Sequence, residues 1–159
     1  MRLMVVAVGH KMPAWVSGGF EEYARRMPRE ARLTLTEVRP ERRNGAPGAG
    51  AIRRLLEAER RRIGAALPAG CRTVVLDERG KSFSTRELSQ RMARWREAGG
   101  DVGFVIGGAD GTAPVLREEA DLVWSLSPLT LPHGLVRIVL AEQLYRAASI
   151  LAHHPYHRE

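Results

Sequence analysis

The chain has 159 residues, a formal net charge of +7 and a sequence pI near 10.6. A hydrophobic content of 44% and a charged content of 27% are typical of a globular protein. No apolar run reaches the roughly 18 residues that a membrane helix requires, the amino terminus lacks a secretory signal, and the single cysteine excludes an internal disulfide. We therefore expect one cytoplasmic domain spanning residues 1–159, with no membrane partner.

The excess positive charge lies in one segment. Residues 25–62 hold 12 arginines against 5 acidic residues, whereas the rest of the chain holds 13 basic and 13 acidic residues. Guanidinium groups bind phosphate oxygens bidentately, so this segment favours a phosphate-bearing partner. The alternative is a solvated basic face that only keeps the protein soluble.

Apolar runs and helical periodicity alternate along the chain. Helices are expected after Pro13, from Ile52 to Leu67, from Ser84 to Ala98, after Pro114 and from Leu135 to Leu151. Alternating strands and helices predict an α/β fold with a mostly parallel sheet flanked by helices. The expected strands are Arg2–Val8, Leu33–Val38, Thr73–Asp77, Asp101–Ile106 and Leu122–Ser125.

Several local features can be tested against a structure. Residues 78–81 (ERGK) are expected to form a turn, and Ser84 with Glu87 a capping box. The helix after Pro13 is expected to bury an apolar stripe of Trp15, Phe20, Tyr23, Ala24 and Met27. The last helix is expected to bury Val136, Val139, Leu140, Leu144, Ala147 and Leu151, while Leu135, Ile138 and Ile150 add apolar surface.

Three predicted strands end in loops that could form a ligand site. The loops are Leu76–Lys81, Gly107–Gly111 and Ser125–Gly134. Ligands of open parallel sheets lie beyond the carboxyl ends of the strands, so neighbouring strands would place these loops around one pocket. Its leucines and backbone groups suit a flat heterocycle such as adenine, and a side chain at Gly108 is expected to enter the pocket. The alternative is that the glycines and prolines of these loops only form tight turns and bind no ligand.

Motifs of several enzyme classes are absent from the sequence. The chain has no spaced-glycine dinucleotide fingerprint, no phosphate-binding P-loop and no nucleophile elbow. His153, His154 and His157 do not form a helical metal-binding pattern because Pro155 interrupts them, and thiolate ligands are lacking. We expect no metal, and we expect His10 and His133 to be hydrogen-bonding residues.

The stretches IGGADG, LSPLTLPHGLVRIVLAEQLYRA and HPYHRE resemble the RlmH-type ribosomal RNA methyltransferases, which belong to the SPOUT class. The likeness extends to VAVGHKMPAWVSGGFEEYARRMP and VVLDERGKSFST, although Ala109 stands where proline or serine is more usual. The resemblance implies a SPOUT-type α/β fold with a C-terminal trefoil knot and a homodimer. It also implies methylation of N3 of a pseudouridine in 23S rRNA of the assembled ribosome.

The resemblance also implies the site residues. Arg146 and the tail residues Tyr156, His157 and Arg158 would hold the base, with His157 the expected proton acceptor. S-adenosyl-L-methionine, the cofactor, would be bound by Leu76, Gly107, Gly108, Ser127, Pro128, Leu129, Thr130, Leu131 and Pro132.

Two other functions are compatible with the residues alone. One is a non-catalytic ribosome-binding factor that uses only its arginine face, and the other is an α/β enzyme acting on a free nucleotide. For the tail, a frayed terminus is the alternative to a catalytic role.

Overall fold

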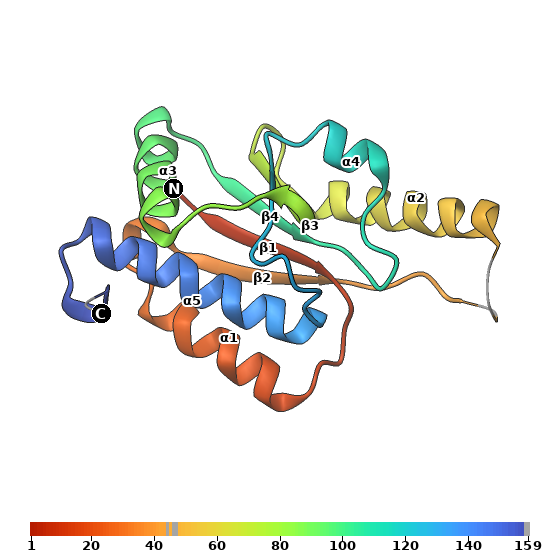
Figure 1. The fold of residues 1–159 in the computed structure, drawn as a ribbon, viewed down its shortest axis with the longest axis horizontal. Coiled ribbons are helices and arrows are strands. Elements are labelled where there is room, and N and C mark those ends of the chain that lie inside the picture. Colours follow the sequence, from red (N-terminus) through yellow and green to blue (C-terminus); the bar gives the residue numbers. More distant parts are fainter. Residues whose placement is uncertain (44, 46–47, 158–159) are drawn as a thin grey trace.

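A computed structural model describes residues 1–43, 45 and 48–157, with the side chain of His157 excepted. Five strands form one sheet in the order β2-β1-β4-β3-β5, and every neighbouring pair is parallel (Figure 1). The predicted mostly parallel α/β sheet is confirmed. The strands are β1 (Leu3–Val8), β2 (Leu33–Val38), β3 (Arg72–Lys81), β4 (Val102–Ile106) and β5 (Leu122–Trp124).

Helices cover both faces of the sheet (Figure 1). Because successive strand side chains point to opposite faces, Val5 of β1 packs toward α1, α3 and α5, whereas Val6 packs toward α2 and α4. The helices are α1 (Ala14–Arg26), α2 (Ala49–Ala66), α3 (Thr85–Ala98), α4 (Pro114–Glu118) and α5 (His133–Leu151), with short 3₁₀ turns η1 (Arg29–Ala31) and η2 (Pro155–His157).

Helix α3 begins as the sequence predicts. The Ser84 hydroxyl accepts a hydrogen bond from the Glu87 backbone N–H at 3.2 Å, and the Glu87 carboxylate accepts one from the Ser84 backbone N–H at 2.7 Å. This capping box satisfies two backbone donors that the first helical turn leaves without partners.

The expected turn at residues 78–81 is wrong, because β3 continues through it. Past a bulge that begins after Leu76, Lys81 pairs with Trp124 of β5. A Cβ atom at Gly80 would lie 2.7 Å from the backbone carbonyl carbon of Trp124. Glycine at this position therefore lets the edge strand β5 approach β3 closely. The prediction of a turn at ERGK assigns this glycine a different role.

Helix α1 buries its predicted stripe except for Trp15: Phe20 and Met27 are buried, and Tyr23 and Ala24 pack against the core. Trp15 is 60% exposed, and Val16 lies in the core beside Phe20. Helix α5 runs close along α1, since a Cβ atom at Gly19 would lie 2.7 Å from Cδ1 of Ile138. The close contact leaves Trp15 outside the core.

Helix α5 buries most of its predicted stripe and one unexpected residue. Leu140, Leu144 and Ala147 are fully buried, and Arg137 is only 1% exposed. Val136, Val139 and Leu151 are half-buried.

Candidate active site

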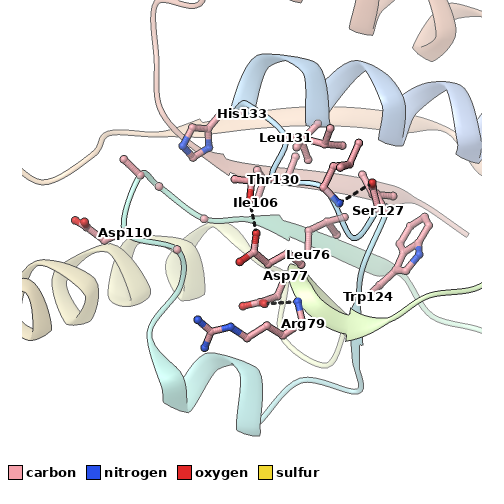
Figure 2. A pocket seen from close by; sticks show the side chains of 18 of the residues that line it. Leu76, Asp77, Arg79, Ile106, Asp110, Trp124, Ser127, Thr130, Leu131 and His133 are labelled. Carbon is pink, nitrogen blue, oxygen red and sulfur yellow. Dashed lines mark hydrogen bonds between the residues drawn. The ribbon is translucent and has the colours of Figure 1, made fainter.

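Residues 76–79 in the second half of β3 and the loops after β4 and β5 line one cavity of about 390 Å³, because these three strands are adjacent in the sheet. A cavity of this size is typical of small-molecule sites. Figure 2 shows side chains from the three strand ends pointing toward it. Of the predicted cofactor residues, the cavity is lined by Leu76, Gly107, Gly108, Ser127, Leu129, Thr130 and Leu131. Pro128 and Pro132 lie exposed in the same loop as the last four.

The cavity has an apolar wall and a charged rim. Leu76, Ile106 and Leu126 contribute aliphatic side chains. Asp77 and Glu78 of β3 contribute carboxylates, and Arg79 and Arg117 contribute guanidinium groups. Such a combination can hold a flat apolar group and a cationic group at once.

Hydrogen bonds fix both carboxylates. The Asp77 carboxylate accepts from the Arg79 backbone N–H and from the Arg117 guanidinium, each at 2.9 Å. Burial acts to raise the pKa of Asp77, but these hydrogen bonds outweigh it and keep the pKa below its ordinary value. The Thr130 hydroxyl donates to the Glu78 carboxylate at 2.8 Å, which ties the loop after β5 to the end of β3.

The two serines of the loop after β5 bond to the loop itself. The Ser125 hydroxyl donates to the Ser127 carbonyl at 2.9 Å, and the Ser127 hydroxyl accepts from the Leu129 backbone N–H at 3.0 Å. Their hydroxyls therefore shape the loop, as is usual for serine in turns.

The glycine loop uses its glycines differently from the prediction. A Cβ atom at Gly107 would lie 2.5 Å from the Gly111 carbonyl oxygen. A Cβ atom at Gly108 would lie 3.1 Å from Oε2 of Glu59 and 3.2 Å from Val8. The expectation that a side chain at Gly108 enters the pocket is thus wrong, since it would press against α2 and β1. The glycines allow the loop to fold and pack.

His133 begins α5 and lines the cavity. Burial is the main cause that lowers the pKa of His133, and the nearby charge of Arg137 lowers it further. A hydrogen bond with the Gly107 backbone opposes these effects. The imidazole is therefore neutral near pH 7.

The tail residues form a second cluster on α5. The Arg146 guanidinium carbon lies 4.9 Å from the ring centroid of Tyr156. The ring centroids of Tyr145 and Tyr156 are 4.6 Å apart. Glu142 accepts hydrogen bonds from Arg146 Nε at 2.7 Å and from the Tyr156 hydroxyl at 3.2 Å. Arg158 lies outside the described residues, and only the backbone of His157 is described.

Burial, followed by hydrogen bonds with Tyr23 and Glu142, raises the pKa of Tyr156 to about 12. The phenol is therefore neutral at physiological pH. It can position a base by packing or by donating a hydrogen bond, but it cannot accept a proton as phenolate at that pH.

The cavity lies at the amino-terminal end of α5, where His133 lines it, and η2 with Tyr156 lies at the carboxyl-terminal end of this helix (Figure 1). His133 begins the helix and Arg146 lies thirteen residues later, which corresponds to about 20 Å at the helical rise. Within the described part of one chain, Arg146 and Tyr156 are therefore not brought together with the predicted cofactor residues.

A family model described as "Predicted SPOUT methyltransferase" matches residues 1–157. The chain belongs to this family. Proteins named ribosomal RNA large subunit methyltransferase H from Burkholderia mallei (strain SAVP1) and Burkholderia pseudomallei (strain K96243) are 56% identical over 158 residues, or 99% of each chain. The predicted RlmH-type relationship is confirmed.

Two solved structures share the fold of this chain. A probable methylase family protein from Haemophilus influenzae Rd KW20 aligns with a TM-score of 0.54 and 12% identity, covering 99% of this chain and 70% of that one. A putative RNA methyltransferase from Bacillus anthracis aligns with a TM-score of 0.50 and 18% identity, covering 92% and 94%. At these identities the likeness concerns the fold alone.

The cavity fits the cofactor that the SPOUT family implies. S-adenosylmethionine carries a flat adenine ring and two cationic groups, a sulfonium and an ammonium. The aliphatic wall formed with Leu76 and Leu126 suits the ring, and the Glu78 carboxylate, which has no ion-pair partner among the described residues, suits a cation.

Sequence reasoning missed several residues of this SPOUT site. Glu142 could have been found, because its spacing of four residues from Arg146 in EQLYR is that of a helical ion pair. Asp77 and Arg117 lie forty residues apart, and no local pattern relates them. Within the described ranges, no three His, Cys, Asp or Glu side chains are grouped as a metal site would require, and no helix is long and apolar enough to span a membrane.

Proposed function

We propose that this chain is an S-adenosylmethionine-dependent methyltransferase of large-subunit ribosomal RNA. The observation that carries the proposal is the 56% identity, over 99% of both chains, to proteins named ribosomal RNA large subunit methyltransferase H. The cavity at the three strand ends supports it independently, because its lining suits the cofactor.

We further propose the narrower features that the resemblance implies. The target is N3 of a pseudouridine in 23S rRNA of the assembled ribosome, and the enzyme acts in the cytoplasm as a single domain of residues 1–159. The chain forms a trefoil knot near its carboxyl terminus. Membership in the SPOUT family and the likeness of the C-terminal motifs support these features.

When bound, S-adenosylmethionine supplies a methyl group on a positively charged sulfur, which leaves as a neutral thioether without an acid catalyst. The tasks left to the chain are to position the reactants and to remove the N3 proton. Arg146 and Tyr156 position the base. Because Tyr156 has a pKa of about 12, we assign removal of the N3 proton to His157. Arg158 helps to hold the base.

The separation of the two clusters supports a homodimer. If both act on one substrate, the tail of one copy must lie at the cavity of the other. Exposed apolar side chains offer a surface for this association, since Trp15 is 60% and Leu135 is 38% exposed near the cavity end of α1 and α5.

The homodimer leads to a direct prediction about mass. In light scattering at micromolar concentration, the wild type should show twice the 17.6 kDa of the chain. Trp15→Glu should shift the mass to that of the monomer, because it places a charge in a desolvated interface. Trp15→Phe, which keeps an aromatic ring, is the control. A wild-type protein that is monomeric at this concentration would contradict the proposed assembly.

A second prediction tests the cofactor cavity. Thr130→Trp should weaken S-adenosylmethionine binding in calorimetry by about tenfold or more, equivalent to about 1.4 kcal/mol, because an indole would fill the cavity mouth. Thr130 is exposed, so the melting temperature should change little. Glu97→Trp, on the exposed face of α3, is the matched control. If the wild type does not bind the cofactor, the proposed reaction is wrong and the ribosome-binding factor is favoured.

A further inference from the structure

A groove of about 700 Å³ runs between the amino-terminal half of α2 and the start of α4. Its floor is apolar and is formed by Ile52 and Leu56 of α2 with Pro114 and Val115 of α4. Arg53 and Arg54 stand at its rim. Figure 1 shows these two helices on the same face of the sheet.

The floor of this groove is not covered by the fold. Along α2 the buried residues are Glu59 and Ile63, which lie in its second half, whereas Ile52 and Leu56 are only half-buried. Val115 is 42% exposed. The sequence predicts one continuous core-facing stripe on this helix, and the structure uses only part of that stripe.

The rim of the groove carries cations that are available for a partner. Arg53 and Arg54 are exposed, and neither has a hydrogen-bond or ion-pair acceptor among the described residues. Arg61 meets only Glu57, at 3.4 Å on the surface. These arginines belong to the segment 25–62 that holds all the surplus charge of the chain.

The groove adjoins the cofactor cavity through the glycine loop. Residues 107–111 line the cavity, and Ala113, two residues further, lines the groove. On the same side, Arg43 of the basic segment pairs with Asp110 of this loop. A polymer lying in the groove would thus pass directly beside the site of methyl transfer.

We propose that this groove binds an unpaired stretch of large-subunit ribosomal RNA, with a base on the apolar floor and neighbouring phosphates on Arg53 and Arg54. This inference rests on the proposed function. It adds a binding site for a part of the RNA other than the nucleotide that is methylated. Charge complementarity favours RNA, because each nucleotide offers both a flat, weakly polar face and an anion, as the floor and rim together require.

Photo-crosslinking at Val115 tests which molecule occupies the groove. Val115 is exposed, so Val115→benzoylphenylalanine should leave the fold intact. On irradiation with large ribosomal subunits, we expect a crosslink to rRNA, mapped by a reverse-transcription stop. The same probe at Glu97, on exposed α3, is the control and should give no comparable stop. A crosslink predominantly to a ribosomal protein or to a second copy of this chain would overturn the proposal.

Salt titration separates the roles of floor and rim. The Arg53→Ala/Arg54→Ala double variant should reduce the slope of log affinity against log salt by about 1.4, for two phosphate contacts to a single strand. The Ile52→Ser/Val115→Ser double variant should lower affinity about tenfold without changing the slope, because apolar contact with the base is lost but no charge is removed. Arg94→Ala/Arg96→Ala on α3 removes equal charge elsewhere and is the control.

Floor variants that bind as tightly as the wild type would overturn the base-binding role. Cofactor binding to the same variants is measured in parallel by calorimetry. If the wild type binds ribosomes but no cofactor, the proposed function fails. If cofactor binding is intact and the groove variants have no effect on ribosome binding, only the groove assignment fails.

Discussion

Deletion of Pro155–Glu159 is expected to lower methyl transfer to ribosomes by about 10²–10⁴-fold, the range for loss of a positioned acid–base group. Cofactor binding should survive, because the tail contributes none of the residues that line the cavity. Some loss of stability is expected too, since Tyr156 packs on Tyr145 and bonds to Glu142. Thermal melting therefore accompanies the activity measurement.

Single substitutions divide the roles within the tail. His157→Ala should account for most of the loss, and its activity should recover in part at high pH, where solvent can remove the imide proton. Tyr156→Phe keeps the ring against Arg146 and Tyr145 and should cost only a few-fold, because a phenol with a pKa of about 12 is not the proton acceptor. A truncated enzyme that works at the wild-type rate would show the tail to be a frayed end.

Mixing two impaired variants tests whether the tail acts across the dimer. The tail deletion and Thr130→Trp impair different parts of the site, so a mixed dimer contains one composite site with neither defect. At a cofactor concentration that limits Thr130→Trp, activity should be higher in the mixture than in either variant alone. A mixture no more active than the average of its components would contradict the shared site.

The largest expected effect on stability comes from Arg137. Its guanidinium is 1% exposed, donates to Glu37 at 2.6 Å and to the Gly9 carbonyl at 3.0 Å, and so ties α5 to the ends of β1 and β2. Arg137→Ala should lower the free energy of unfolding by about 3 kcal/mol. That lies at the lower end of the range for broken buried pairs, because Glu37 remains partly hydrated.

Urea denaturation of Arg137→Ala measures this contribution. Glu37→Gln is the control: it keeps an oxygen acceptor for Arg137 and should cost clearly less. If Arg137→Met, which fills similar volume without charge, proves as stable as the wild type, packing rather than the ion pair would explain the burial of Arg137.

The strands and the loops after β4 and β5 could be predicted from sequence because both depend on local patterns, whereas the loop predicted after Leu76 is part of β3. Val5 and Val6 stand in a continuous apolar run that is typical of a strand buried on both faces. Leu76 and Gly107 follow such runs, and parallel pairing then brings their loops together. The order of the strands, which places β3 between β4 and β5, had to come from the structure.

Features that depend on distant contacts could not be predicted. Arg137 reads as a solvent-facing residue in an apolar helix, since its partners Glu37 and Gly9 lie 100 and 128 residues away. The sequence predicts that Trp15 is buried in the core, because apolar periodicity does not distinguish a core residue from an exposed residue that contacts a partner. What a side chain at Gly108 would contact depends on Glu59, which belongs to the distant helix α2.

The central claim is that this chain methylates ribosomal RNA in the large subunit. Purified protein incubated with methyl-labelled S-adenosylmethionine should transfer label to rRNA of assembled ribosomes, and mapping should place it at a single pseudouridine. Protein-free rRNA and free nucleotides should remain unlabelled. Tight ribosome binding without any transfer of label would contradict the account, as would efficient labelling of free nucleotides.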